Sequence, residues 1–123
     1  MLESVLREDT GGFVYADGIG QLRRRIRVFF ACPPPNVREA PIIIAMHGVN
    51  RAAAEFRDSM AVQSTRNGQI VLVPEFDTGQ FPDVHAYHFG GVRLPPPGNT
   101  VLPRKRWNFG LLDRLFEHVR DAI

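Results

Sequence analysis

Two continuous apolar runs, residues 42–46 and 70–74, dominate the centre of the chain. Neither run alternates with polar residues, and both are far too short to cross a membrane. This pattern is typical of strands that are buried on both faces of a sheet. Residues 23–32 alternate arginine with apolar side chains over their first half, which predicts an antiparallel strand near a sheet edge. Residues 12–16 form a shorter strand, which we expect to end in a hairpin turn at Asp17-Gly18.

The segments around these strands carry the residue spacing of amphipathic helices. Between the two buried runs, Asn50 is the expected N-terminal cap of a helix and Asn67-Gly68 its expected stop. Its apolar stripe consists of Ala53, Phe56, Met60 and Ala61. Residues 107–123 form a second helix, with Arg114 and the other charged residues expected on its solvent face. A strand, a helix and a strand predict a parallel crossover, so the fold class is α/β.

Composition restricts the class of protein. The 123 residues are enough for one domain, and 44% hydrophobic with 23% charged residues is typical of a globular protein. The first residues lack the apolar core of a signal peptide. The single cysteine, Cys32, excludes an internal disulfide, fits a reducing compartment and is expected to be buried in a strand. We therefore expect a cytoplasmic protein without a membrane partner.

The charge of the chain is nearly balanced, with 15 basic and 13 acidic residues. Arginine-rich clusters at residues 23–25 and 104–106 could form a nucleic-acid-binding patch. No nucleic-acid-binding motif accompanies these clusters, so we favour solvated edges. The expectation is that the protein has no nucleic-acid partner.

Residues 75–103 differ from the rest of the chain in their many prolines and glycines and their scattered aromatic residues. A loop of this length inside a compact domain is often functional, and this one begins where the second buried strand ends. At its start, Glu75 and Asp77 could perform acid–base chemistry, although we favour a structural role. The loop is therefore expected to line the rim of any site at this edge of the sheet.

A zinc site is an alternative use of this loop. Asp83, His85 and His88 have a spacing that could hold Zn²⁺. We favour two surface histidines, because no fourth ligand and no cysteine pair accompanies them. No metal or other cofactor is therefore expected.

The order of these features resembles the first half of an α/β-hydrolase. Within that superfamily it is most similar to polyhydroxyalkanoate-depolymerase-like and esterase-like serine hydrolases. The resemblance rests on His47-Gly48 after a buried strand, the helical residues 55–58, residues 73–77 and the Phe-Gly-Gly sequence at 89–91. It implies one incomplete α/β-hydrolase domain over residues 1–123, with two antiparallel strands followed by parallel strands and a crossover helix.

The resemblance also implies a site. In α/β-hydrolases, a backbone N–H just after this His-Gly position helps to form the oxyanion hole. That role falls on Val49 first and Asn50 second, and the implied substrate is a small-molecule ester. The substrate site is implied to include His47, Gly48, Phe76, Tyr87 and Phe89.

The chain departs from the family at the nucleophile, which belongs in a Gly-x-Ser-x-Gly elbow. Its serines, Ser4, Ser59 and Ser64, do not lie between glycines at that spacing. We therefore expect the N-terminal portion of a serine ester hydrolase, truncated before the nucleophile elbow. Such a chain would be inactive alone and prone to self-association through exposed core surface and strand edges. The alternative is a non-catalytic or zinc-binding module that uses the loop with Asp83, His85 and His88.

Overall fold

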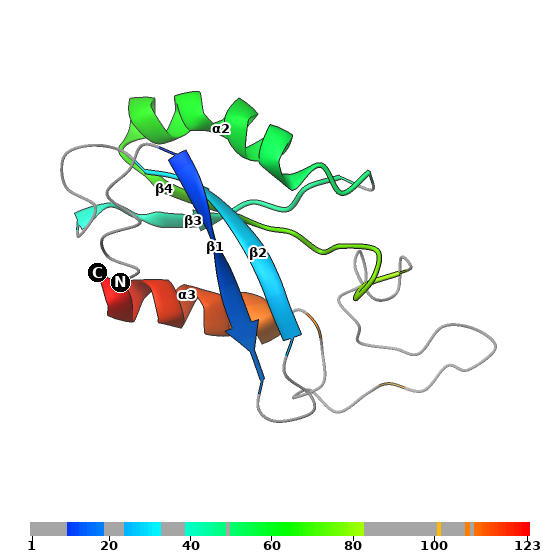
Figure 1. Cartoon of the computed structure of the whole chain (residues 1–123). Coiled ribbons are helices and arrows are strands. Elements are labelled where there is room, and N and C mark those ends of the chain that lie inside the picture. Colours follow the sequence, from blue (N-terminus) through cyan, green and yellow to red (C-terminus); the bar gives the residue numbers. More distant parts are fainter. Residues whose placement is uncertain are drawn as a thin grey trace.

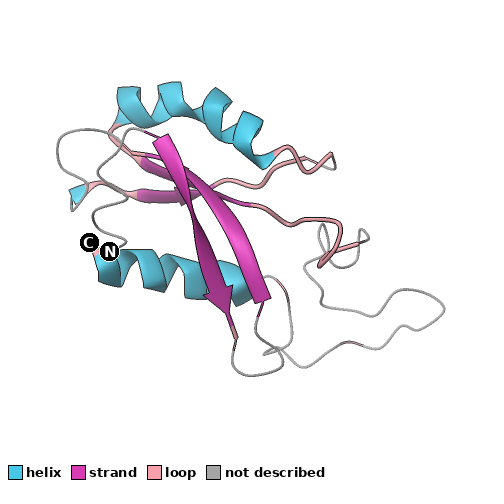
Figure 2. Ribbon diagram, in the orientation of Figure 1, coloured by secondary structure: helices cyan, strands magenta, loops and turns pink. Residues whose placement is uncertain are grey.

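The structure is a computed structural model of the chain, and it describes residues 10–18, 24–32, 39–48, 50–82, 101, 108 and 110–123. Four strands form one mixed sheet, and α2 and α3 cover its opposite faces (Figures 1 and 2). The elements in chain order are β1 (Thr10–Asp17), β2 (Arg24–Ala31), β3 (Ile42–Ile44), α2 (Ala53–Asn67), β4 (Ile70–Pro74) and α3 (Gly110–Ala122). The predicted α/β class is confirmed. Among these residues, no helix has the length and apolar content needed to cross a membrane.

The sheet has the strand order β1-β2-β4-β3. β2 is antiparallel to both β1 and β4, whereas β3 and β4 are parallel and are connected through α2. The predicted pair of antiparallel strands followed by a parallel crossover is therefore confirmed. The predicted tight turn at Asp17-Gly18 was wrong, because β1 continues through Asp17 and β2 begins only at Arg24. The connection over residues 18–23 is longer than a two-residue hairpin.

The two apolar runs differ in their burial. All residues of β4 are buried, because β4 has a strand on each side and a helix over each face. The three isoleucines of β3 are only half-buried, and β3 is one of the two edge strands of the sheet among the described residues. Burial on both faces is thus confirmed for residues 70–74 and not met for β3. An apolar run does not reveal whether a further strand covers its edge.

Alternation along the strands divides the core into two parts. The larger part faces α3 and includes Tyr15, Ile26, Val28, Phe30, Cys32, Ile70, Leu72, Leu111, Leu115 and Val119. The smaller part faces α2 and consists of Ala31, Ala53, Val71 and Val73, with half-buried side chains around them. Fully burying one large apolar side chain contributes about 1.5–3 kcal/mol, so the α3 side dominates the stability. Burial also raises the pKa of the Cys32 thiol to about 12, which agrees with the predicted buried position.

The two ends of α2 differ in how well the sequence predicted them. Gly68 adopts a left-handed conformation with φ 65°, and its N–H donates to the Ser64 carbonyl, so the predicted stop is confirmed. The predicted cap at Asn50 was wrong. The cap residue is Ala52, which makes no side-chain capping bond, and Asn50 Oδ1 accepts the Ala52 N–H at 3.4 Å. Asn50 therefore shapes the turn before the helix.

A buried ion pair ties α3 to β1. Asp17 is 2% exposed and accepts two hydrogen bonds from Arg114, at 2.7 Å from Nε and 3.0 Å from Nη2. Arg24 of β2 adds a longer contact of 3.5 Å to the same carboxylate. The Arg114 side chain is 41% exposed, so its predicted place on the solvent face is met only in part. The predicted helix is otherwise present, although it begins at Gly110 and not at residue 107.

Candidate active site

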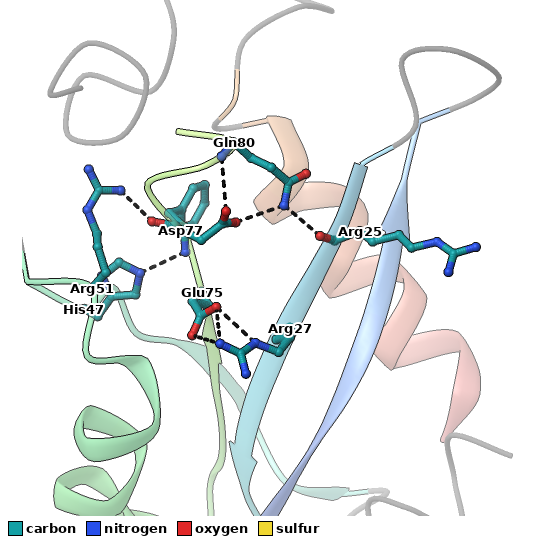
Figure 3. Close-up of polar contacts among 8 residues, drawn as sticks. Arg25, Arg27, His47, Arg51, Glu75, Asp77 and Gln80 are labelled. Carbon is teal, nitrogen blue, oxygen red and sulfur yellow. Dashed lines mark hydrogen bonds and ion pairs between the residues drawn. The ribbon is translucent and has the colours of Figure 1, made fainter. Parts of the chain in front are cut away.

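The candidate site lies where β3 and β4 end. Because these strands are parallel, their carboxyl ends meet at one edge of the sheet, where α/β sheets commonly bind ligands. Residues 45–52 follow β3 and lead into α2, and residues 75–82 follow β4. In Figure 3, His47 and Arg51 of the first segment lie on the same side of the second segment and point toward it. Side chains of residues 45–52 are therefore hydrogen-bonded to the backbone of residues 75–82.

His47 is buried, with 3% of its surface exposed, and both of its ring nitrogens have partners. Nε2 accepts a hydrogen bond from the backbone N–H of Phe76 at 2.9 Å, and Nδ1 lies 2.8 Å from the Gly48 carbonyl oxygen. These partners assign the ring proton to Nδ1, because Nε2 must accept. Burial lowers the pKa of His47, so the neutral ring is favoured. His47 therefore joins two backbone segments and is not positioned to act as a base.

A second hydrogen bond closes the turn after β3. The backbone N–H of Arg51 donates to the Gly48 carbonyl at 3.1 Å, so this oxygen has two partners. Arg51 has φ 61° and is the one residue other than glycine with a positive φ in the described part of the chain. A left-handed conformation costs about 1–2 kcal/mol for a residue with a Cβ. Neighbouring contacts must therefore hold Arg51 in this conformation.

The side chain of Arg51 supplies one such contact. Its Nη1 donates to the Phe76 carbonyl at 2.5 Å. Since His47 accepts from the Phe76 N–H, both backbone polar groups of Phe76 are bonded to the turn. The turn is thus fastened to the segment after β4 at two points on a single residue.

Among the described residues, Gly48 has room for a larger side chain. A Cβ built on Gly48 would meet Asn50 Oδ1 at 3.5 Å, which is an ordinary van der Waals contact, and the residue does not have a positive φ. The described residues therefore do not require glycine here. Asn50, the second expected oxyanion donor, is exposed beside this open position. Val49, the first expected donor, lies outside the described residues.

Phe76 reaches the site through its backbone. Its ring is fully buried in the core that faces α3, with an edge-to-face contact to Phe81 at 4.7 Å between centroids. The His47 ring lies 6.2 Å from it. The Phe76 side chain therefore lies in the core that faces α3, whereas its backbone N–H and carbonyl bond to the turn. Tyr87 and Phe89, the other aromatic residues expected to contact substrate, lie outside the described residues.

The two acids after β4 make structural contacts (Figure 3). Arg27 Nη2 donates to both carboxylate oxygens of Glu75, at 2.7 and 2.8 Å. Asp77 accepts the backbone N–H and the side-chain amide of Gln80, at 3.1 and 2.9 Å. The Gln80 amide also donates to the Arg25 carbonyl of β2 at 2.8 Å. These contacts support the structural role that the sequence favoured over an acid–base pair.

The described serines lack the surroundings of a nucleophile. Ser59 and Ser64 both lie within α2, as predicted, and each has its hydroxyl engaged with backbone carbonyls. Ser64 is buried, with Oγ 2.6 Å from the Gln69 carbonyl oxygen and 3.2 Å from that of Ala31. It therefore secures the end of α2 to the sheet. Ser4 lies outside the described residues.

No group of three or more His, Cys, Asp or Glu side chains in the described part of the chain could hold a metal ion. The zinc alternative, Asp83, His85 and His88, lies outside that part. The sequence thus found His47 and Gly48 but missed Arg51 and the backbone of Phe76. Arg51 lies between two periodic segments, and periodicity does not report the φ angle on which its role depends.

Two solved structures are similar to this one. Poly(aspartic acid) hydrolase-1 from Sphingomonas sp. KT-1 matches with a TM-score of 0.80 and 26% sequence identity, over 95% of this chain and 42% of that chain. LpqC, a poly(3-hydroxybutyrate) depolymerase from Bordetella parapertussis, matches with a TM-score of 0.79 and 21% identity, over 92% of this chain and 38% of that chain. A scan against protein-family models and a search of the curated proteins find no match.

These likenesses concern a part of each neighbour, because this chain spans about two-fifths of the length of either protein. The strand order, the parallel crossover through α2 and the turn at His47-Gly48 agree with the resemblance found in the sequence. The fold class that this resemblance implied is likewise the one observed. The chain therefore has a partial α/β-hydrolase fold.

Proposed function

We propose that this chain supplies the oxyanion-stabilising part of a hydrolase that cleaves esters by acyl transfer to a serine. The observation that carries the proposal is the closed turn at the end of β3. Its Gly48 carbonyl is held by the His47 ring and by the Arg51 N–H. In a trans peptide the C=O and the following N–H point in opposite directions. We therefore assign the N–H that follows the Gly48 carbonyl the role of donor to a substrate oxygen.

Such donors suit the chemistry of ester cleavage. Attack on the carbonyl carbon creates a tetrahedral intermediate with negative charge on one oxygen, and fixed N–H groups stabilise it without reorganising. Removing one oxyanion donor typically costs about 3–4 kcal/mol of transition-state stabilisation. Under this proposal, Val49 and Asn50 donate and His47 orients the turn. The nucleophile and its base come from residues beyond those in this chain.

The two structural neighbours support a hydrolase, since their names describe the cleavage of poly(aspartic acid) and poly(3-hydroxybutyrate). The proposed substrate is an ester of a carboxylic acid, the bond type of poly(3-hydroxybutyrate). Poly(aspartic acid) is joined by amide bonds, which acyl transfer to a serine also cleaves. Substrate contacts are proposed for Gly48 and for the loop with Tyr87 and Phe89. The ring of Phe76 is buried against Phe81 and near the His47 ring, so its proposed role is to support the turn.

A serine-directed fluorophosphonate probe and a p-nitrophenyl ester test this proposal. The chain alone is expected to show neither labelling nor turnover above buffer. Expressed with the sequence that flanks it in its gene, it is expected to hydrolyse the ester and to be labelled at one serine outside residues 1–123. Turnover by the chain alone that survives Ser59→Ala with Ser64→Ala would contradict a serine mechanism. Absence of labelling in the longer protein would also overturn the proposal.

A further inference from the structure

The side chain of Arg51 connects two segments that are far apart in the sequence. Its Nη1 donates to the Phe76 carbonyl, and His47 accepts the N–H of the same residue (Figure 3). The segment after β4 is itself anchored, because Gln80 joins Asp77 to the Arg25 carbonyl of β2. Arg51 therefore fastens the turn to a part of the molecule that the sheet already holds.

The backbone of Arg51 provides a second, independent observation. At φ 61°, glycine would be accommodated without the steric cost that arginine carries. A strained conformation persists only where surrounding contacts hold it. The guanidinium bond to Phe76 and the N–H bond to Gly48 are two such contacts. Replacing Arg51 by glycine would remove the side-chain bond and relieve the backbone at the same time, so any loosening of the turn would come from the lost bond and not from added backbone strain.

We propose that Arg51 is a positioning residue, which fixes the turn from His47 to Arg51 through its bond to the Phe76 carbonyl. Arg51 does not touch substrate in this proposal. It holds the turn that, under the proposed function, presents the N–H groups of Val49 and Asn50 to the oxyanion. The effect on catalysis rests on the proposed function, whereas the effect on the turn can be measured in this chain alone.

Amide hydrogen exchange measured by NMR tests the effect on the turn. In Arg51→Gly, the Phe76 amide keeps His47 as its acceptor but is expected to exchange about tenfold faster. Losing the Arg51 bond to the Phe76 carbonyl would lower the free energy of opening this residue by about 1.4 kcal/mol. The amide of Leu72, in the middle of β4, is expected to exchange at the wild-type rate, and the thermal midpoint is expected not to fall. Arg51→Lys keeps one charged donor and is expected to restore Phe76 exchange to within about threefold of wild type.

Arg120→Ala is the matched control, because Arg120 is an exposed arginine of α3 paired with its neighbour Asp121. It is expected to leave the exchange of Phe76 unchanged. Unchanged Phe76 exchange in Arg51→Gly would overturn the proposal. Equal acceleration at Phe76 and Leu72 would also overturn it, because it would show a general loss of stability.

The longer protein tests the effect on catalysis. Arg51→Gly is expected to lower kcat about tenfold, with KM within about twofold, because the turn acts on the transition state and not on bound substrate. An unchanged kcat with accelerated exchange would overturn the catalytic part of the proposal. Absence of any esterase activity in the unmutated longer protein would refute the proposed function, and the exchange measurements would still decide whether Arg51 fixes the turn.

Discussion

Two polar clusters lie at the same edge of the sheet, and they stabilise the chain in different ways. The ion-pair cluster consists of Asp17, Arg24 and Arg114 and joins β1, β2 and α3 through charged side chains. The histidine cluster consists of His47, Arg51 and Phe76 and joins the turn after β3 to the end of β4, chiefly through the Phe76 backbone. The first cluster holds a helix in place, whereas the second sets the direction of backbone groups.

The clusters meet at Phe81. The Arg24 guanidinium lies 5.0 Å from the Phe81 ring centre, and the Phe81 ring contacts Phe76. Ion pairs therefore secure the assembly of distant elements on one side of this aromatic pair, and hydrogen bonds to the Phe76 backbone fix a turn on the other. This difference implies that mutations in the ion-pair cluster affect mainly stability, and mutations in the histidine cluster mainly local geometry and pH dependence.

The largest effect on stability is expected for Asp17→Asn. Removing one partner of a buried ion pair costs about 3–5 kcal/mol, and we expect about 3 kcal/mol because Arg114 is 41% exposed and remains partly hydrated. Urea unfolding followed by circular dichroism measures this loss. The matched control is Asp121→Asn, which removes an exposed pair with Arg120 and is expected to cost less than about 0.5 kcal/mol. Equal losses of stability in Asp17→Asn and Asp121→Asn would show that the ion-pair cluster stabilises the chain no more than an exposed pair does. The proposed difference between the two clusters would then be lost.

The ion-pair cluster also shows what sequence alone could not predict. Asp17 and Arg114 are 97 positions apart, and their contact depends on how α3 is rotated and shifted over β1. Helical periodicity placed Arg114 with the other charged residues on the solvent face, because it does not distinguish a charge in water from one that meets a buried partner. The residues of β4 and the glycine stop of α2 were predictable, since each depends on a local pattern.

The histidine cluster was predictable only in part. The sequence indicated His47-Gly48 because an apolar run stops there, and this placed the turn at the correct edge of the sheet. It did not reveal that the His47 ring bonds to Phe76, because that bond depends on the parallel register of β3 and β4. The sequence could therefore predict features that depend on a local pattern. It could not predict contacts that depend on the register between strands far apart in the chain.

A smaller loss, with a distinct pH dependence, is expected for His47→Leu. Leucine cannot accept the Phe76 N–H, and an unsatisfied buried donor costs about 1–3 kcal/mol, so we expect about 2 kcal/mol at pH 7.5. Because burial lowers the pKa of His47, the unfolded chain binds a proton more readily than the folded chain. The stabilisation that the neutral His47 ring provides is therefore present above the ordinary histidine pKa of 6.5 and is lost as the pH falls below it.

Urea unfolding at several pH values between 5 and 7.5 measures this dependence. The free energy of unfolding of the wild type is expected to fall more steeply below pH 6.5 than that of His47→Leu, so the two curves converge in acid. His47→Gln serves as the conservative variant, since its amide can accept the Phe76 N–H without titrating. Parallel curves for all three proteins would show that His47 does not titrate with a lowered pKa.

The smallest effect on stability is expected for Gly48→Ala, at a residue whose carbonyl bonds to two residues of the histidine cluster, His47 and Arg51. Among the described residues, the added Cβ would meet Asn50 Oδ1 alone and at an ordinary distance, and Gly48 does not have a positive φ. A glycine replaced by alanine at such a position gains about 0.4–1 kcal/mol, because the unfolded chain loses conformational freedom. Urea unfolding of the chain is therefore expected to show unchanged or slightly increased stability.

Under the proposed function, the same substitution in the longer protein is expected to lower kcat/KM for the ester, since a methyl group at Gly48 would occupy space proposed for the substrate carbonyl. Stability and activity would then change in opposite directions at one residue. That result would show that glycine is present for the approach of a ligand and not for folding. A loss of stability larger than about 1 kcal/mol would instead show that the turn needs glycine for its own conformation.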